Sequence, residues 1–253
     1  MKAMILAAGL GTRLRPLTDD RPKALVEING RTMLELALSR LRSSGVSEVV
    51  INVYHFADRI VDYLKTNHNF GMRIAVSREE TLLDTGGGLK KAAAFFRETP
   101  LHPDEPFLLH NVDVLSTIDF ARMAQWHSER QALATLAVQR RITSRYLLFD
   151  SNLQLCGRRS GSDGEPELVG LAAQSPQCVH ALAFSGVHII SPRLLAMMTE
   201  EGTFSIIAPY LRLAAQGEKI LAFRADPYYW RDLGKPDSVA QAALDLKQKV
   251  IVP

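Results

Sequence analysis

The sequence contains little cysteine and no long apolar run. Cys156 and Cys178 are its two cysteines, too few for a disulfide framework and without the paired CxxC spacing of a zinc site. We therefore expect both thiols to be reduced. No apolar segment reaches the roughly 18 residues that a membrane-spanning helix needs, and the N-terminal apolar run is too short for a signal peptide. These absences predict a soluble cytoplasmic protein with no membrane partner.

The chain also lacks a charge excess, a linker-like stretch, an internal repeat and a low-complexity tract. Lys and Arg number 30 against 27 Asp and Glu, and the net charge of +3 gives no sign of a nucleic-acid-binding protein. With 253 residues and 47% apolar content, the chain can bury one sizeable core. We expect a single domain over residues 1–253. Its composition leaves open whether the protein is a monomer or a homodimer.

Residues 4–26, MILAAGLGTRLRPLTDDRPKALV, join an apolar strand to a glycine-rich loop and two cations. Glycine lets the backbone turn tightly, so that its N–H groups can face an anion. The loop residues that we expect to do so are Gly9, Gly11 and Thr12. Arg13 and Lys23 can add positive charge to the same pocket.

Two better-known glycine-rich loops do not fit this stretch. A GxxxxGK[ST] loop needs Lys directly after its second Gly, where Thr12 stands, and a dinucleotide fingerprint needs a third Gly, where Leu14 stands. On the glycines alone, an ordinary strand-to-helix turn is the alternative to an anion-binding loop.

Short apolar runs alternate with helical patterns in the first half of the chain. The runs at residues 3–6, 48–53, 73–76 and 107–110 predict buried strands, and residues 33–43 and 57–66 predict helices. Strands that alternate with helices imply an α/β fold with a mostly parallel sheet covered on both faces. Ligands of such sheets bind at the carboxyl ends of the strands, which is where the glycine-rich loop begins.

The second half of the chain mixes strands and helices. We expect strands at residues 133–140 and 181–190, a polar loop at 158–166, and a thumb-like hairpin over 147–159. Helices are predicted at residues 192–199, 205–216 and 236–249. The triple glycine of residues 79–89, EETLLDTGGGL, is expected to precede a helix over residues 90–97.

GxGTRL followed by RPK about ten residues later resembles the signature loop of the sugar-phosphate nucleotidyltransferases. These enzymes transfer a nucleoside monophosphate from a nucleoside triphosphate to a sugar 1-phosphate. The resemblance implies a Rossmann-like three-layer sandwich of the nucleotide-diphospho-sugar transferase type. It also implies that Gly9, Gly11, Thr12 and Arg13 surround the triphosphate, while Lys23 lies near the phosphates that are joined.

Two aspartates end apolar runs, Asp113 in PFLLHNVD and Asp232 in YYWRD. A helix cap or a turn is the alternative explanation for each. NVD and WRDLGKPDS resemble the two acidic motifs of the family, whose aspartates jointly hold Mg²⁺, and carboxylates suit such a hard cation. The sequence departs from the family pattern at Val112, where a small residue is common, and at Lys235, where Thr is usual.

Two further segments resemble the family's substrate-binding elements. EETLLDTGGGL resembles a motif whose backbone contacts the nucleobase, although a plain helix-entry loop is an equal alternative. FSGVHII at residues 184–190 resembles a segment that approaches the sugar. The resemblance therefore suggests nucleobase contacts from Ala8, Glu80, Thr85, Gly86 and Gly87, and sugar contacts from Ser185 and Gly186. Asn111 could orient a phosphate or the ribose, or be structural.

The resemblance covers nearly the whole chain, but no E-x-K-P sugar-phosphate motif appears between Gly157 and Gly170. That absence weakens an assignment to glucose 1-phosphate. The pattern looks most like the N-acetylmuramate 1-phosphate uridylyltransferases of bacterial cell-wall recycling, with the mannose 1-phosphate guanylyltransferases as close alternatives. A catalytically silent nucleotide-sugar-binding regulator of the same fold is a third alternative.

Overall fold

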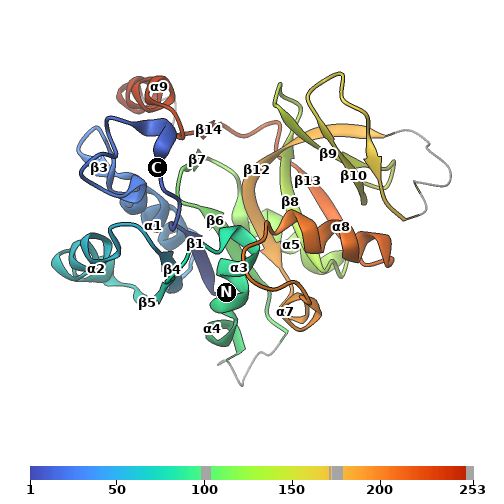
Figure 1. The fold of residues 1–253 in the computed structure, drawn as a ribbon, viewed down its shortest axis with the longest axis horizontal. Coiled ribbons are helices and arrows are strands. Elements are labelled where there is room, and N and C mark those ends of the chain that lie inside the picture. Colours follow the sequence, from blue (N-terminus) through green and yellow to red (C-terminus); the bar gives the residue numbers. More distant parts are fainter. Residues whose placement is uncertain (98–103, 171, 173–178, 249–253) are drawn as a thin grey trace.

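The computed structural model describes residues 1–97, 104–170, 172 and 179–248 (Figure 1). Its strands are β1 (Ala3–Leu6), β2 (Glu27–Ile28), β3 (Arg31–Thr32), β4 (Glu48–Val53), β5 (Arg73–Arg78), β6 (Phe107–Asn111), β7 (Val114–Ser116), β8 (Ala134–Gln139), β9 (Arg145–Phe149), β10 (Leu155–Ser160), β11 (Glu167–Leu168), β12 (His180–Ile190), β13 (Ile220–Arg224) and β14 (Trp230–Asp232). Its helices are α1 (Met33–Ser43), α2 (Ala57–Thr66), α3 (Asp84–Lys91), α4 (Ala93–Arg97), α5 (Phe120–Glu129), α7 (Arg193–Met197), α8 (Ile207–Ala215) and α9 (Pro236–Lys247), with short 3₁₀ turns η1 (Thr12–Leu14), η2 (Lys23–Leu25) and η3 (His68–Gly71).

The central sheet confirms the predicted α/β class. Strands β5, β4, β1 and β6 are neighbours and run parallel, and Ala3 of β1 is aligned with Val49 on one side and Leu108 on the other. Strand β12 is antiparallel to both β6 and β8, while β13 runs parallel to β8. The sheet is therefore mostly parallel in its central part, with β12 reversed.

Helices cover both faces of the sheet and make three layers (Figure 1). Successive side chains of a strand point to opposite faces, and β1 shows this directly. Ala3 and Ile5 pack in one core with α1, α2, α5 and α9. Met4 packs in the other core with α3, α4, α7 and α8. The alternation in β1 thus divides the apolar residues between two buried layers.

Local capping explains where two of the helices begin. Thr32 Oγ1 accepts a hydrogen bond from the backbone N–H of Glu35 at 3.0 Å at the start of α1. Asp119 caps α5 in the same way, accepting from Arg122 N at 2.9 Å. Such caps satisfy N–H groups that have no partner inside the helix. The predicted bounds of the first two helices, residues 33–43 and 57–66, agree with α1 and α2.

Beyond β12, strands β9, β10 and β11 extend the sheet as an antiparallel ribbon, which contains the predicted hairpin. The loop predicted at residues 158–166 begins later than expected, because β10 continues to Ser160. Arg158 is exposed in this ribbon and its Nε donates to Glu167 Oε2 at 2.6 Å. A ribbon with one face in water tolerates such charged residues. The polar sequence of residues 158–160 therefore suggested a loop where the strand in fact continues.

The other predicted elements of the second half agree within a few residues. Lys249, the last residue of the expected C-terminal helix, lies outside the described residues, as does Cys178. Cys156 is buried and forms no disulfide, and burial raises the pKa of its thiol to about 11. Across the described ranges, no helix combines the length and the apolar character that crossing a bilayer requires.

The triple glycine lies inside α3 and not before a helix, which corrects the sequence-based expectation. Close packing explains this placement. A Cβ on Gly86 would lie 2.4 Å from the ring of Phe204, one on Gly87 would lie 2.5 Å from the carbonyl oxygen of Gly202, and one on Gly88 would meet the side chains of Asn52 and Glu79. Glycine costs helix stability, but here only glycine lets the segment around residue 204 reach the helix.

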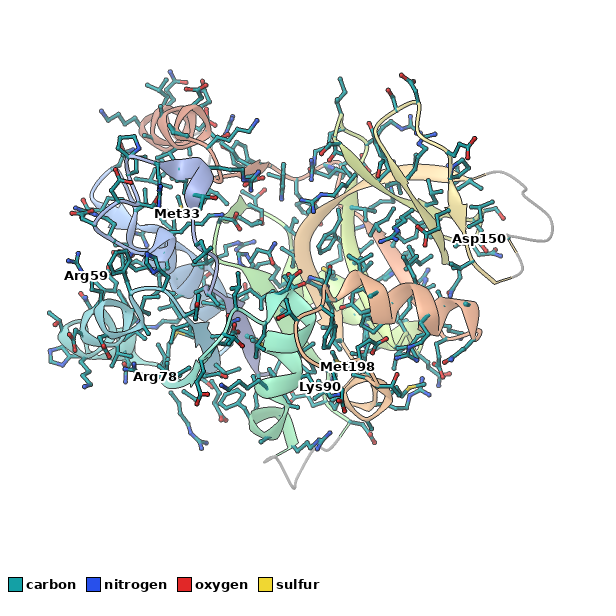
Figure 2. The ribbon with its side chains drawn as sticks, in the orientation of Figure 1. Met33, Arg59, Arg78, Lys90, Asp150 and Met198 are labelled. Atoms are coloured by element: carbon teal, nitrogen blue, oxygen red, sulfur yellow. The ribbon has the colours of Figure 1, made fainter. Side chains whose placement is uncertain are left out.

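Helix α3 and the segment that follows α7 are also linked by a charged side chain. Figure 2 labels Lys90 of α3 beside Met198, and Lys90 Nζ donates to the carbonyl oxygen of Glu200 at 2.5 Å. The backbone N–H groups of Gly86 and Gly87 both donate to the carbonyl oxygen of Phe204, at 2.9 and 3.3 Å. The backbone N–H groups of Gly86 and Gly87, near the start of α3, therefore already have a hydrogen-bond partner within the protein.

Gly86→Ala is expected to lower the free energy of unfolding by about 1–3 kcal/mol, because an added Cβ cannot fit against Phe204 without displacing it. Urea titration followed by circular dichroism measures the change. Gly9→Ala is the matched control, since no atom lies within 4 Å of a Cβ at Gly9. Equal stabilities of the two variants would contradict this account of the packing.

Candidate active site

The glycine loop, defined here as residues 9–13, follows the carboxyl end of β1 and turns back on itself. Gly11 has a φ of 68°, and its carbonyl oxygen accepts from Leu14 N at 2.8 Å and from Thr18 Oγ1 at 2.9 Å. A Cβ at Gly11 would lie 3.1 Å from Lys23 Cβ. The loop therefore needs glycine at this position, both for the left-handed conformation and for contact with Lys23.

Part of the glycine loop is exposed to solvent. Gly9, Thr12 and Arg13 are exposed, whereas Ala8 is buried. The loop thus presents backbone and a guanidinium at the ligand edge of the sheet, where an anion could reach them.

The short ribbon of β7 and β14 brings two distant aspartates together. Asp113 and Asp232 are 119 positions apart in the sequence, but Asp232 is aligned with Val114, and Leu233 N donates to the carbonyl oxygen of Asp113 at 2.8 Å. In Figure 1 this ribbon lies between α9 and β12. The second aspartate is therefore placed beside the first by a backbone pairing.

Each aspartate lies near a cation. Lys23 Nζ forms an ion pair with Asp113 Oδ2. Asp232 Oδ1 accepts from Gly234 N at 2.7 Å. A Cβ on Gly234 would lie 2.8 Å from Asp232 Oδ1 and 3.0 Å from Arg13 Nη2, so that carboxylate and guanidinium share the space above this glycine. The four charged residues that we expected at the site are thus gathered around the end of the β7–β14 ribbon.

The expected sugar-binding residues lie where β12 changes register between Phe184 and His188. Gly186 has a φ of 72°, and its Cβ would lie 2.9 Å from Asn111 Nδ2 and 2.8 Å from Val114 Cγ2. Asn111 Oδ1 and Ser185 Oγ are both buried without a hydrogen-bond partner among the described atoms. Two buried polar atoms without hydrogen-bond partners therefore lie next to the ribbon that bears the aspartates.

The expected base-binding residues have different surroundings. Glu80 is exposed, Thr85 Oγ1 accepts from Ile206 N at 2.9 Å, and Gly86 and Gly87 face the segment around Phe204. Of these residues, Glu80 is the exposed one. The glycines have a packing role that is sufficient to explain them.

Sequence reasoning missed a buried pair beside these residues. Asn52 Nδ2 donates to Glu79 Oε1 at 2.7 Å, Asn52 Oδ1 accepts from Ala7 N at 2.8 Å, and Glu79 Oε2 accepts from Leu83 N at 2.9 Å. This network ties the end of β1 to the start of α3. The one available signal was an Asn inside an otherwise apolar strand run.

Three histidines, His110, His127 and His188, are buried. Burial lowers the pKa of His110 and of His127 to about 4, and that of His188 to about 3. All three are therefore neutral at pH 7. His188 Nδ1 lies 2.9 Å from Tyr210 Oη, and His127 Nδ1 lies 3.0 Å from Thr135 Oγ1.

The donor set suits a hard divalent cation that takes some of its ligands from substrate. In the described ranges, no group of three or more His, Cys, Asp or Glu side chains could enclose a metal ion. Magnesium is typically bound through one or two carboxylates, with waters and substrate phosphates as its other ligands. Asp113 and Asp232 fit that pattern as two neighbouring carboxylates, and Lys23 Nζ pairs with one of them.

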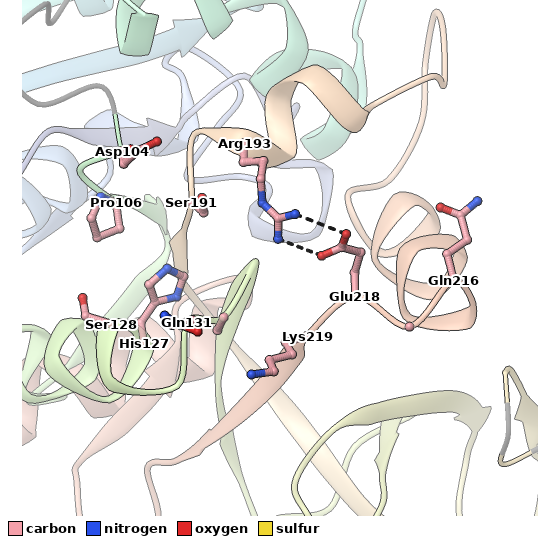
Figure 3. Close-up of a pocket in the computed structure, with 12 residues that line it drawn as sticks. Asp104, Pro106, His127, Ser128, Gln131, Ser191, Arg193, Gln216, Glu218 and Lys219 are labelled. Atoms are coloured by element: carbon pink, nitrogen blue, oxygen red, sulfur yellow. Dashed lines mark hydrogen bonds and ion pairs between the residues drawn. The ribbon is translucent and has the colours of Figure 1, made fainter.

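A hollow lies away from these residues. It has a volume of about 680 Å³ and is lined by His127, Ser191, Arg193, Glu218 and Lys219, among others (Figure 3). Arg193 Nη2 and Glu218 Oε2 pair across it at 2.8 Å. These residues flank the starts of β8 and β13 and the end of β12, the edge of the sheet opposite to the glycine loop. The Arg193 and Glu218 charges neutralise one another there, and Lys219 Nζ donates to the carbonyl oxygen of Arg130 at 3.2 Å.

The fold and the site define an α/β protein with phosphate-compatible groups at the carboxyl edge of a mostly parallel sheet. The family model described as "Nucleotidyl transferase" matches residues 2–147. The chain belongs to this family, the sugar-phosphate nucleotidyltransferases, as its sequence pattern predicted.

Two curated relatives and one solved structure give the scale of the similarity. The N-acetylmuramate alpha-1-phosphate uridylyltransferase of Caulobacter vibrioides is 33% identical over 97% of each chain. A mannose-1-phosphate guanyltransferase of Yarrowia lipolytica is 29% identical over 93% of this chain and 61% of its own length. A crystal structure of UDP-glucose pyrophosphorylase with UDP-glucose matches with a TM-score of 0.76 over 98% of both chains at 18% identity, which is a likeness of fold.

Proposed function

We propose that the chain transfers UMP from UTP to N-acetylmuramate 1-phosphate, releasing pyrophosphate and forming the nucleotide-sugar of cell-wall recycling. The pairing of β14 with β7 carries the proposal, because it sets Asp232 beside Asp113 with Lys23 and Arg13 around them. The 33% identical uridylyltransferase supports this choice of substrates. We propose residues 1–253 as one catalytic domain that acts in the cytoplasm, either as a monomer or as a homodimer.

The proposed reaction is an in-line attack of a sugar 1-phosphate oxygen on the α-phosphorus of UTP, with pyrophosphate as the leaving group. The nucleophile is already an anion, so no general base is needed, and the protein's part is positioning and charge neutralisation. Arg13 stabilises the departing pyrophosphate from the glycine loop. Lys23 draws the two reacting phosphates together against their mutual repulsion.

Asp113 and Asp232 would hold Mg²⁺. When bound, the ion would neutralise charge on the triphosphate and on the phosphates being joined. Because Lys23 pairs with Oδ2 of Asp113 in this structure, its ammonium group would compete with a metal ion for the charge of this carboxylate.

The remaining residues divide between the nucleotide and the sugar. The backbone of Gly9, Gly11 and Thr12 would face the triphosphate, and the base would approach Ala8, Glu80, Thr85, Gly86 and Gly87. The sugar would lie near Ser185, Gly186 and Asn111. The unpartnered Asn111 Oδ1 and Ser185 Oγ support the second group, because a buried polar atom without a partner is costly.

The second candidate is GTP with mannose 1-phosphate, which the 29% identical guanyltransferase favours. A catalytically silent nucleotide-sugar-binding regulator is the alternative function that is not enzymatic. The complete set of Arg13, Lys23, Asp113 and Asp232 argues against it, since binding alone does not require all four charges.

Pyrophosphate release separates these functions. The protein is mixed with Mg²⁺, UTP or GTP, and N-acetylmuramate, N-acetylglucosamine, glucose or mannose 1-phosphate, and product is measured enzymatically. The proposal expects the highest kcat/KM with UTP and N-acetylmuramate 1-phosphate. A preference for GTP and mannose 1-phosphate would replace it with the second candidate, and no release in any combination would favour the regulator.

A further inference from the structure

Arg141 lies next to the proposed active site, in the loop between β8 and β9. Its Cζ is 3.6 Å from the centre of the Trp230 ring, two residues before Asp232, and its Nη2 donates to the carbonyl oxygen of Phe184 at 2.6 Å. Trp230 Nε1 in turn donates to the carbonyl oxygen of Ser185 at 2.7 Å. The guanidinium is therefore fixed between the ribbon that bears Asp232 and the irregular part of β12.

Arg159 of β10 repeats this arrangement one strand away. Its Cζ lies 5.3 Å from the centre of the ring of Tyr146, the residue aligned with it on β9. Tyr146 and Asp232 both contribute to the electrostatic surroundings of Arg141. Two guanidinium groups are thus held against aromatic rings, and Tyr146 links them because it neighbours both Arg159 and Arg141. A cation–π contact of this kind orders the cation without neutralising it.

Neither guanidinium has an acidic partner within the described chain. Arg141 and Arg159 take part in none of its ion pairs. The Nε atoms of both residues are buried without a hydrogen-bond partner, although each side chain remains partly exposed. Burial lowers the pKa of Arg141, against the opposing effect of Asp232. Partly buried cations without an acid are costly unless a ligand supplies the anion.

The position of the two arginines indicates which anionic group of the ligand they bind. The triphosphate and the reacting phosphates have their own cations in Arg13 and Lys23, on the β1 side of Asp232. Arg141 lies on the β12 side, beside Ser185, where the proposed function places the sugar. A planar guanidinium suits a carboxylate, which it can bind through two parallel hydrogen bonds.

We infer that Arg141 and Arg159 bind a carboxylate carried by the sugar, which makes them the residues that select an acidic sugar 1-phosphate over a neutral one. This inference rests on the proposed function. N-acetylmuramate is N-acetylglucosamine with an added lactyl carboxylate, so the two 1-phosphates differ in the group that the arginines recognise.

The test compares these two sugars in steady-state kinetics with UTP. Arg141→Met and Arg159→Met should each raise KM for N-acetylmuramate 1-phosphate by about 10- to 100-fold, the effect of losing a hydrogen bond to a charged group. Neither should change KM for N-acetylglucosamine 1-phosphate or kcat by more than about twofold. Arg141→Lys keeps the charge but loses the planar fork, and it should lie between wild type and Arg141→Met.

Arg140→Met is the matched control. Arg140 is exposed, and its substitution removes the same charge one residue away from Arg141. Thermal unfolding of each variant checks the fold, and Arg159→Met and Arg141→Lys carry the test if Arg141→Met does not fold. Equal losses with both sugars, or no loss with either, would overturn the inference. If wild type itself does not use N-acetylmuramate 1-phosphate, the proposed function fails before any variant is compared.

Discussion

Asp113→Asn and Asp232→Asn should each lower the rate of pyrophosphate release by about 10³-fold or more without unfolding the protein. Asparagine has nearly the same shape as aspartate, so the β7–β14 pairing and the bond from Gly234 N to the side chain at 232 can persist. What is lost is the negative charge that would hold a divalent cation beside the phosphates. Pyrophosphate release with UTP and N-acetylmuramate 1-phosphate measures the effect.

Asp237→Asn is the control for this pair of variants. Asp237 is exposed in the first turn of α9, five residues beyond Asp232, and its substitution changes the net charge equally. It should leave the rate within about twofold of wild type. Far-UV circular dichroism and the unfolding temperature establish that all three variants are folded. A near-normal rate in either site variant would remove that aspartate from the proposed metal site.

Lys23→Gln is expected to lower the rate by about 10²- to 10³-fold and at the same time to strengthen Mn²⁺ binding in the absence of nucleotide. Both effects follow from the ion pair between Lys23 and Asp113. Lys23 neutralises phosphates during turnover, but in the free protein it competes with a metal ion for the same carboxylate. Titration of Mn²⁺ followed by electron paramagnetic resonance measures the second effect without any reaction.

Arg21→Gln serves as the matched control for Lys23→Gln. Arg21 is two positions away, its side chain is 41% exposed, and it pairs with Asp20. It should change neither the rate nor the affinity for Mn²⁺ by more than about twofold. If Lys23→Gln weakened Mn²⁺ binding, Lys23 and the metal ion would not compete for Asp113.

The layered α/β fold could be predicted because its main signals are local. Runs such as residues 48–53 show an apolar strand, and residues 33–43 show a helix that begins just after a Thr cap with Glu three residues beyond it. The alternation of such elements fixed the fold class before any contact was known. The boundaries that were misplaced, at Ser160 and Asp84, lie where polarity and glycine content conflict with the pairing or packing that the structure contains.

Other features depend on contacts between residues far apart in the sequence. Gly86 is glycine because of Phe204, and Glu79 is buried because of Asn52. Arg141 belongs to no local sequence motif, and only its contacts with Trp230 and Phe184 place it beside the proposed active site. Propensity and spacing do not contain such information. The roles of individual site residues therefore stay predictions that the variants above address.

The β7–β14 ribbon also has a consequence for synthesis of the chain. Asp113 emerges from the ribosome long before Asp232, and a nascent chain that ends before β14 can build β1, β4, β5 and β6 but only one of the two acidic groups. The growing polypeptide is thus expected to lack the paired carboxylates until β14 has been synthesised and has paired with β7.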